Sequence, residues 1–233
     1  MQKIVIILVL ILLSITSSLI LKEQAYGETY TDPVTAMEFV KIKNGLYMGK
    51  FEVTNAQFRK YRPDHNSREF KGNSLNGDTQ PAVYVSANDA DDFAKWLSDK
   101  TGMKYRLPTN KDWESACKAG TDKDKYWVTE DDACLYANVE DKSAQGDSSS
   151  SAQFKCDDGF AVTAPAGSKM PNNLGLYDML GNVWEWSGDI SNDTLFIHGG
   201  SWDFHGIVSC TFRNSRKTGM YDAAIGFRLV LEK

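Results

Sequence analysis

The fold of this chain is decided by one stretch, residues 174–186, which reads LGLYDMLGNVWEW. Two Trp and one Tyr lie in this stretch, yet Asp178, Asn182 and Glu185 stand between its apolar side chains. Large aromatic side chains are normally buried, and a buried carboxylate without a partner is strongly destabilising. The acidic residues therefore either cap turns and face solvent or are neutralised by a partner such as a bound cation. Calcium is one such cation, because it binds carboxylate and backbone carbonyl oxygens together.

The same stretch is similar to the signature of the formylglycine-generating-enzyme (sulfatase-modifying-factor) family. Other motifs follow the family's order, over about residues 37 to 231: FEVTN at 51–55, RLPT at 106–109 followed by WE at 113–114, GGSW at 199–202 and GFRL at 226–229. The resemblance implies an α+β fold, the C-type lectin-like fold of the formylglycine-generating-enzyme type. Such a domain has short strands, two main helices and much irregular structure.

Length and composition favour a single sizeable domain. The chain has 233 residues, of which 42% are hydrophobic, and this is enough to bury one core. Its formal net charge is −5, with no run of basic residues, so the charge pattern of a nucleic-acid-binding protein is missing. A mildly acidic surface is compatible with calcium.

The N-terminal segment has the pattern of a secretory signal peptide. Lys3 precedes an unbroken aliphatic run at residues 4–13, and Ala25-Tyr26-Gly27 supplies a small-x-small cleavage pattern. We therefore expect a signal peptide at residues 1–27 and the domain at residues 28–233. An uncleaved N-terminal anchor is the alternative, because the apolar stretch approaches the length needed to span a bilayer. In both cases the domain is expected outside the cytoplasm, as a secreted, periplasmic or cell-surface protein.

Hydrophobic patterns before residue 86 predict strands and one short helix. Residues 37–61 indicate a β-hairpin followed by a helix capped by Thr54 or Asn55. Residues 62–80 are polar and rich in Gly and Asn, as is typical of a loop. Residues 81–85, PAVYV, predict a strand.

Two longer helices are expected next. Ser86 is the predicted N-cap of a helix over residues 88–100, and Gly102 is its predicted end. A second helix is expected to follow Thr109 and to stop at Gly120. Cys117 lies on the apolar face of that helix, where it is expected to act as a small buried hydrophobic residue.

The segment from 121 to 170 shows little regular pattern and needs cross-links to hold it. Cys134 and Cys156 bracket most of it. In an exported protein a disulfide between them would close a loop of 22 residues, which the chain-entropy model values at about 3 kcal/mol. We therefore expect this disulfide.

The resemblance also implies two calcium sites, each built from two side chains and two backbone carbonyl groups. The first set is Asn138 and Asp158 with the carbonyls of Val139 and Phe160. The second set is Asp178 and Glu185 with the carbonyls of Gly181 and Val183. Asp178 stands where the family more often has Asn, a change that keeps an oxygen ligand. The three histidines of the chain are scattered, without the spacing of a histidine metal site.

The catalytic chemistry of the family depends on two cysteines shortly after the GGSW-type motif, which bind copper(I) as thiolates. In this chain the two positions hold Phe204 and Ser209, and Cys210 stands alone one residue further on. One thiolate cannot form the two-thiolate site that copper(I) requires. The resemblance therefore implies the scaffold without the oxidase chemistry. A formylglycine-generating oxidase that acts on sulfatase cysteines is kept as an alternative.

Residues 203–216, DFHGIVSCTFRNSR, show neither a strand period nor a helix period. Lys, Glu, Gln, Met and Trp are all absent from this segment, although 48 of the 233 residues belong to those types, so its composition looks sampled. The remaining types are those reached when the adenines of an AAC or AAT codon are randomised, and residues 221–225 obey the same restriction. This resembles the variable proteins of diversity-generating retroelements, which display such residues on a C-type lectin-like scaffold.

We therefore expect an exported, non-catalytic protein that presents residues 203–225 to an unknown protein or cell-surface ligand. Phe204, Phe212, Arg213 and Tyr221 are the candidate anchors, because aromatic and Arg side chains dominate such faces. The full set of candidate binding residues is Asp203, Phe204, His205, Ile207, Ser209, Phe212, Arg213, Asn214, Tyr221 and Asp222. The alternative is an unspecialised structural module in which these side chains pack into the core. Phe212 in particular could belong to a strand.

Overall fold

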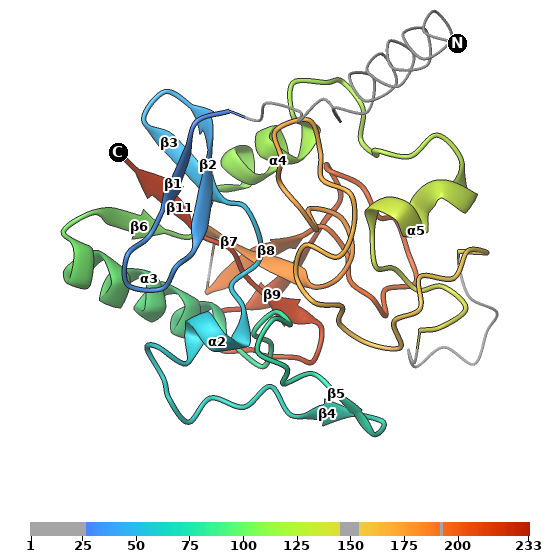
Figure 1. Ribbon diagram of the computed structural model, residues 1–233, viewed down its shortest axis with the longest axis horizontal. Coiled ribbons are helices and arrows are strands. Elements are labelled where there is room, and N and C mark those ends of the chain that lie inside the picture. Colours follow the sequence, from blue (N-terminus) through green and yellow to red (C-terminus); the bar gives the residue numbers. More distant parts are fainter. Residues whose placement is uncertain (1–26, 145–153, 192) are drawn as a thin grey trace, which may run out of the picture.

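The computed structural model of the protein describes residues 27–144, 154–191 and 193–233 (Figure 1). The predicted signal peptide, residues 1–27, therefore lies outside the described residues except for Gly27. Within the described ranges, no helix is both long and apolar enough to cross a lipid bilayer.

The first sheet joins the two ends of the domain. Its five antiparallel strands run in the order β1-β2-β3-β11-β6, with bounds Thr29–Thr31, Glu38–Lys43, Leu46–Gly49, Val230–Glu232 and Lys104–Arg106. β2 and β3 form the predicted hairpin. β11 pairs with β3 on one side and with β6 on the other, so the last strand of the chain lies inside the sheet that the first strands begin.

The second sheet carries the segments of functional interest. Its strands run in the order β10-β7-β8-β9, with bounds Ile225–Gly226, Trp184–Ser191, Thr194–His198 and Arg213–Lys217. β9 is an edge strand, so the C-terminal end of residues 203–216 forms a strand although the sequence there shows no strand period. Its side chains are polar on both faces and alternate only between exposed and half-buried, which leaves no hydrophobic period in the sequence.

A small hairpin lies within the predicted loop at residues 62–80. It pairs β4, Glu69–Phe70, with β5, Asn73–Ser74, in antiparallel register. Two-residue strands are too short to show an alternating pattern, so the loop prediction was wrong here for lack of signal.

Residues 81–85 do not form the predicted strand. Their only ladder contact is an isolated bridge between Pro81 and Thr54, and Tyr84 has a φ of 56°, which no regular strand contains. Val85 instead accepts a hydrogen bond at its carbonyl from the Trp186 indole nitrogen at 3.0 Å. The run is apolar because it is buried under neighbouring tryptophans, and burial alone does not distinguish a strand from an irregular segment.

The first three helices begin where the sequence predicts, whereas the short helical segment at residues 130–136 was not predicted. Their bounds are α2 Asn55–Phe58, α3 Ala87–Thr101, α4 Asn110–Lys118 and α5 Ala133–Tyr136, the last preceded by a 3-10 turn at Glu130–Asp132. Thr54, Ser86 and Thr109 cap the first three helices through reciprocal capping boxes. Gly102 ends α3 in the left-handed conformation, as predicted. α4 ends at Ala119 rather than Gly120, because Ala119 already has a φ of 49°.

The core is divided between the two long helices. In Figure 1, α3 lies below β7 and β11 and α4 lies above them. Phe93 of α3 packs on Phe58 and Phe227, whereas Trp113 of α4 belongs to a second buried cluster. The motif tryptophans are buried, as predicted: Trp184, Trp186 and Trp202.

The four cysteines of the chain form two disulfides. Cys134 pairs with Cys156, which confirms the predicted cross-link. Cys117 pairs with Cys210, so the expectations that Cys117 is only a small hydrophobic residue and that Cys210 stands alone are wrong. The second pair spans 93 residues and joins α4 to the segment before β9, a contact that only the folded chain creates.

Candidate ligand-binding face and carboxylate centre

The segment between β8 and β9 starts from a rigid anchor. Trp202 is fully buried and packs on Phe70, with 5.3 Å between ring centroids. The next residue, Asp203, is held at its Oδ1 by the hydroxyl of Ser201 at 2.7 Å. The segment that follows therefore starts from a fixed position on the core.

Phe204 and Phe212 form a half-buried aromatic pair. Their rings stack at a centroid distance of 5.7 Å, and both lie against Trp184, at 4.7 and 6.2 Å. The pair therefore belongs partly to the core and partly to the surface. Phe212 comes directly before β9. It therefore lies next to a strand, whereas the sequence allowed it to belong to one.

The loop that carries His205 and Ile207 faces solvent. The Nδ1 atom of His205 lies 2.8 Å from Oε2 of Glu140, a carboxylate whose side chain is only 4% exposed, whereas the His205 side chain is 55% exposed. Ile207 is 60% exposed, and it borders an open groove together with His205, Gly206, Lys125 and Glu130. Glu140 thus orients an exposed imidazole beside an exposed aliphatic side chain.

The edge strand β9 presents a cationic surface. The guanidinium of Arg213 is exposed and lies over the Phe196 ring at 4.6 Å. Asn214 accepts the Ser215 backbone N–H at 2.9 Å, and Arg216 donates to the Ser215 carbonyl at 2.9 Å. These two side chains cover backbone groups that an edge strand would otherwise offer to another strand.

Tyr221 and Asp222 are the last exposed residues of the segment. Tyr221 packs edge-on against Tyr84, with 6.4 Å between centroids, and remains 54% exposed. Asp222 caps the following turn by accepting the Ala224 backbone N–H at 3.0 Å. Residues 223–225 are buried and lead into β10.

The structure therefore separates the ten candidate binding residues into three groups. Five are exposed: His205, Ile207, Arg213, Tyr221 and Asp222. Four are half-buried: Asp203, Phe204, Phe212 and Asn214. Ser209 is buried and its hydroxyl accepts the Phe212 backbone N–H at 3.1 Å, so it does not belong to the exposed face. Sequence alone could not separate these groups, because the segment shows no period.

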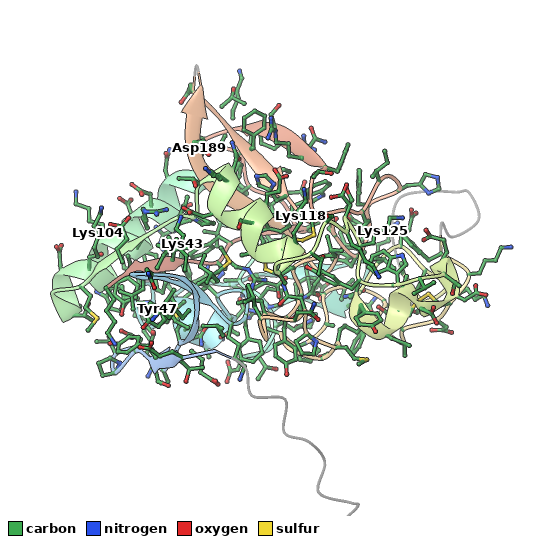
Figure 2. The ribbon with its side chains drawn as sticks, turned by 90° about the horizontal axis from the view of Figure 1, so that it is seen from above. Lys43, Tyr47, Lys104, Lys118, Lys125 and Asp189 are labelled. Atoms are coloured by element: carbon green, nitrogen blue, oxygen red, sulfur yellow. A yellow bond between two sulfur atoms is a disulfide. The ribbon has the colours of Figure 1, made fainter. Side chains whose placement is uncertain are left out.

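A pocket that the sequence did not indicate opens beside the Cys117–Cys210 disulfide. It has a volume of about 190 Å³, and Lys118 and Lys125, both labelled in Figure 2, lie on its wall with Tyr126. The hydroxyl of Tyr126, a residue of the pocket wall, lies 3.0 Å from Cys117 Sγ of the disulfide. Tyr126 belongs to the irregular segment, where no pattern reports which side chains face inward.

The carboxylate of Glu185 has an internal counter-ion. Arg228 binds it through Nε at 2.7 and 2.9 Å and through Nη2 at 2.6 Å, and the Trp113 indole nitrogen donates to it at 2.7 Å. Arg228 also donates to the carbonyls of Gly49 and Tyr177. A bound cation was one possible partner of Glu185 in the sequence. In the structure its partner is Arg228, the arginine of the GFRL motif.

Two further carboxylates surround this ion pair. Glu52, which the sequence reasoning missed, accepts hydrogen bonds from the Asn182 amide at 2.8 Å and the Val183 backbone N–H at 3.3 Å. Burial, with the nearby charges of Asp178 and Glu185, raises the pKa of Glu52 well above its usual value. Burial also raises the pKa of Asp178 to about 6. One arginine therefore lies near three buried carboxyl groups, and their mutual repulsion favours the protonated form of Glu52.

Asp178 sits in a strained turn. Its φ is 53°, a left-handed conformation that Asn and Asp adopt more readily than other residues. Oδ2 accepts the Gly167 backbone N–H at 2.6 Å, and Oδ1 is buried without a hydrogen-bond partner. Gly181 is required nearby, because a Cβ there would lie 2.2 Å from the Asn138 carbonyl oxygen.

The side chains of the first predicted calcium set, Asn138 and Asp158, are partly engaged in hydrogen bonds. The Asn138 amide donates to the Val162 carbonyl at 2.9 Å, and its Oδ1 is buried without a partner. Asp158 Oδ1 accepts the Phe160 backbone N–H at 2.8 Å, and its Oδ2 lies 3.3 Å from the ammonium of Lys169. The adjacent Val139 side chain is buried in the core.

Three oxygens of the two predicted sets, Asn138 Oδ1, Asp158 Oδ2 and Asp178 Oδ1, are buried without a hydrogen-bond partner, but other groups already compensate part of each set. Both oxygens of Glu185 are occupied by Arg228 and Trp113, and Asp158 is already paired with Lys169. Calcium remains a prediction of the resemblance, and no step of the function below depends on it.

The positions of the family's copper ligands hold no thiolate here. Phe204 is stacked on Phe212, and Ser209 is buried in a turn. Cys210, the nearest sulfur in sequence, is fully buried and bonded to Cys117. A disulfide sulfur cannot serve as a thiolate ligand to copper(I).

Comparison with known proteins gives the chain its family. The model of the sulfatase-modifying factor enzyme 1-like domain matches residues 18–233. The chain is 36% identical over 110 residues to the formylglycine-generating enzyme of Thermomonospora curvata, covering 47% of this chain and 33% of that protein. It is 34% identical over 128 residues to the inactive C-alpha-formylglycine-generating enzyme 2 of Mus musculus, covering 52% and 37%. The matches thus span about a third of these curated relatives.

A solved structure shares the same fold over nearly its full length. Treponema denticola variable protein 1 superposes with a TM-score of 0.68 at 21% identity, covering 88% of this chain and 99% of that one. At this identity the similarity concerns the fold alone. The family match and this superposition agree with the order of the five motifs and with the two short-stranded sheets. The chain therefore belongs to the family of the sulfatase-modifying factor enzyme 1-like domain, with its C-type lectin-like fold.

Proposed function

We propose that this chain is an exported, non-catalytic binding protein that presents the exposed part of residues 203–225 to a protein or cell-surface ligand. The observation that supports the non-catalytic part most directly is the state of Cys210. Its sulfur is locked in a buried disulfide with Cys117, and the two copper-ligand positions hold Phe204 and Ser209. The family's oxidase reaction would have no copper(I) centre on this chain.

An oxidase assay tests this part of the proposal. The purified chain is incubated with copper(I), oxygen and a peptide that carries the sulfatase-type cysteine, with an active formylglycine-generating enzyme as the positive control. We expect no aldehyde by mass spectrometry. Turnover by this chain would instead support the alternative function, the formylglycine-generating oxidase.

The binding part of the proposal rests on the placement of the exposed residues. His205, Ile207, Arg213 and Tyr221 project from a segment anchored by buried Trp202 and by the disulfide at Cys210. A rigid base under mixed aromatic, aliphatic and cationic side chains suits recognition, because few rotamers are lost when the ligand binds. The unspecialised structural module remains the competing function.

Sequence variation distinguishes these two functions. If the segment is diversified at adenines, copies of this gene from many isolates should differ at the codons of His205, Ile207, Arg213 and Tyr221. Cys210 and residues 174–186 should stay constant, because they hold the disulfide and the core. A reverse-transcriptase gene nearby with a near-repeat of the segment should accompany this pattern. Differences spread evenly over surface codons would favour the structural module.

Export is the third part of the proposal. Two disulfides within one domain are typical of an oxidising compartment, in agreement with the signal-like N-terminus. N-terminal sequencing of protein recovered from outside the cytoplasm should begin at Glu28. Recovery of the whole chain with free thiols from the cytoplasm would contradict this part.

A further inference from the structure

Lys169 is a buried cation beside the first predicted calcium set. Its side chain is only 7% exposed, although lysine is among the residues most rarely buried. The ammonium lies 3.3 Å from Asp158 Oδ2 and 3.5 Å from the Asp158 carbonyl oxygen. It also lies 5.0 Å above the centre of the Phe160 ring. Every one of these contacts is to a residue that the resemblance assigns to the calcium set.

Asp158 depends on Lys169 for its neutralisation. The Asp158 side chain is fully buried, and its Oδ1 accepts the Phe160 backbone N–H. Its Oδ2 makes no hydrogen bond, so the ammonium is the charge that compensates it. A buried carboxylate without such a partner would be strongly destabilising.

We propose that the ammonium of Lys169 takes the place of a metal ion at Asp158. The loop around Asp158 is then stabilised without calcium. Calcium needs about six to eight oxygen ligands at roughly 2.3–2.6 Å, and its affinity rises with the number of charged ligands. With Asp158 engaged, the rest of the set, the Asn138 side chain and the carbonyls of Val139 and Phe160, consists of neutral oxygens. The positive charge of Lys169 also repels a second cation at the same carboxylate.

One carboxylate of the second predicted set, Glu185, is compensated in the same way. Glu185 is neutralised by Arg228, another cationic side chain of the chain itself. In both places a cation supplied by the sequence compensates a buried carboxylate. The inference for Lys169 does not depend on the proposed binding function, because it concerns the support of the loop rather than the displayed face.

Calcium titration of the full chain tests the proposal. Calcium is added to the protein up to about millimolar, the range of weak extracellular sites, while heat and Tm are recorded. We expect no heat of binding that depends on Asp158 and equal Tm in calcium and in chelator. Binding that disappears in Asp158→Asn would overturn the proposal, whereas binding that survives in Asp158→Asn belongs to another part of the molecule.

Removal of the ammonium should restore a response to calcium. Lys169→Met keeps the length of the side chain but leaves Asp158 uncompensated, so its Tm should fall in chelator and rise again with calcium. Lys142→Met, at an exposed lysine of the same region, is the matched control and should behave like the wild type. If Lys169→Met does not fold in chelator, recovery of folding with calcium supports the proposal. A variant that calcium does not stabilise contradicts it.

Discussion

At the scale of single residues, the ion pair between Glu185 and Arg228 is the centre of the molecule. Both side chains are fully buried, and the arginine also faces Glu52 and Asp178. The pair explains how the WEW motif can place a carboxylate between two buried tryptophans. A buried pair of this kind is weak evidence for net stabilisation, but breaking it leaves a charge without compensation.

We therefore predict that Arg228→Met lowers the free energy of unfolding by about 3–5 kcal/mol, because three carboxyl groups lose their only arginine. The double variant Glu185→Gln/Arg228→Met should lose less, since it removes one of those charges. Urea unfolding of the wild type, the two single variants and the double variant measures the coupling between the residues. Additive losses would show that the pair acts only by filling space.

His198 gives the protein a second residue-scale property, a dependence of stability on pH. Its ring is buried, stacks on Trp113 at 4.8 Å and lies 2.7 Å through Nε2 from Asn110 Oδ1. Burial, with a smaller contribution from Arg213, lowers the pKa of His198 to about 4. In the unfolded chain a histidine titrates near ~6.5, so below that pH the unfolded state binds more protons than the folded state.

The free energy of unfolding should therefore fall as pH drops from about 6.5 toward 4. His198→Gln, which keeps a hydrogen-bond donor for Asn110 but cannot titrate, should reduce the loss between pH 7 and pH 4.5 by roughly 2 kcal/mol. Urea unfolding of wild type and variant at the two pH values gives this difference. A variant that loses as much stability as the wild type would assign the pH dependence to other groups.

At the scale of elements, the two disulfides hold the irregular parts of the fold. Cys134–Cys156 closes 22 residues around the segment after α5, and Cys117–Cys210 ties α4 to the segment before β9 over 93 residues. In the chain-entropy model the longer loop contributes more, at about 4–5 kcal/mol against about 3 kcal/mol. The same bond also fixes the displayed segment onto a helix.

Cys117→Ala/Cys210→Ala should therefore destabilise the protein by more than Cys134→Ala/Cys156→Ala. The first variant should also make the segment at residues 203–212 more sensitive to proteolysis, because its cross-link to α4 is lost. Thermal unfolding and limited proteolysis of both double variants provide the comparison. Equal losses of Tm would mean that strain or residual structure, rather than loop length, sets the value of each bond.

At the scale of the whole molecule, the displayed surface and the core should respond differently to substitution. Ile207, Arg213 and Tyr221 are exposed, so their simultaneous replacement by Ala should change stability by no more than about 0.5 kcal/mol each. Trp184→Ala should cost on the order of 3–5 kcal/mol, because it empties a buried volume. Phe204→Ala should fall between them, since its ring is half-buried against Trp184.

Thermal unfolding of these variants tests whether residues 203–225 form a face that can vary. A triple variant that unfolds would place the three side chains in the core and favour the unspecialised structural module. Because Phe204 rests on Trp184, it is omitted from the surface set, although the sequence grouped it with the exposed anchors.

The sequence by itself determined the family, the three helix caps and the Cys134–Cys156 disulfide. These signals are local or follow a fixed order along the chain: a cap depends on residues three positions apart, and the motif order survives without knowledge of contacts. The burial of the three motif tryptophans followed from the same local reading. The sequence also showed that the copper-ligand positions carry no cysteine.

Only the tertiary structure decided which partner each buried group takes. Glu185 meets Arg228 across 43 residues, Cys117 meets Cys210 across 93, and Asp158 meets Lys169 from a different turn of the irregular segment. A hydrophobic or polar pattern reports that a side chain is buried or charged, but it does not report what lies opposite. The neutralising cation of each carboxylate is therefore a property of the packed chain, because desolvation forces a choice of partner that the linear sequence leaves open.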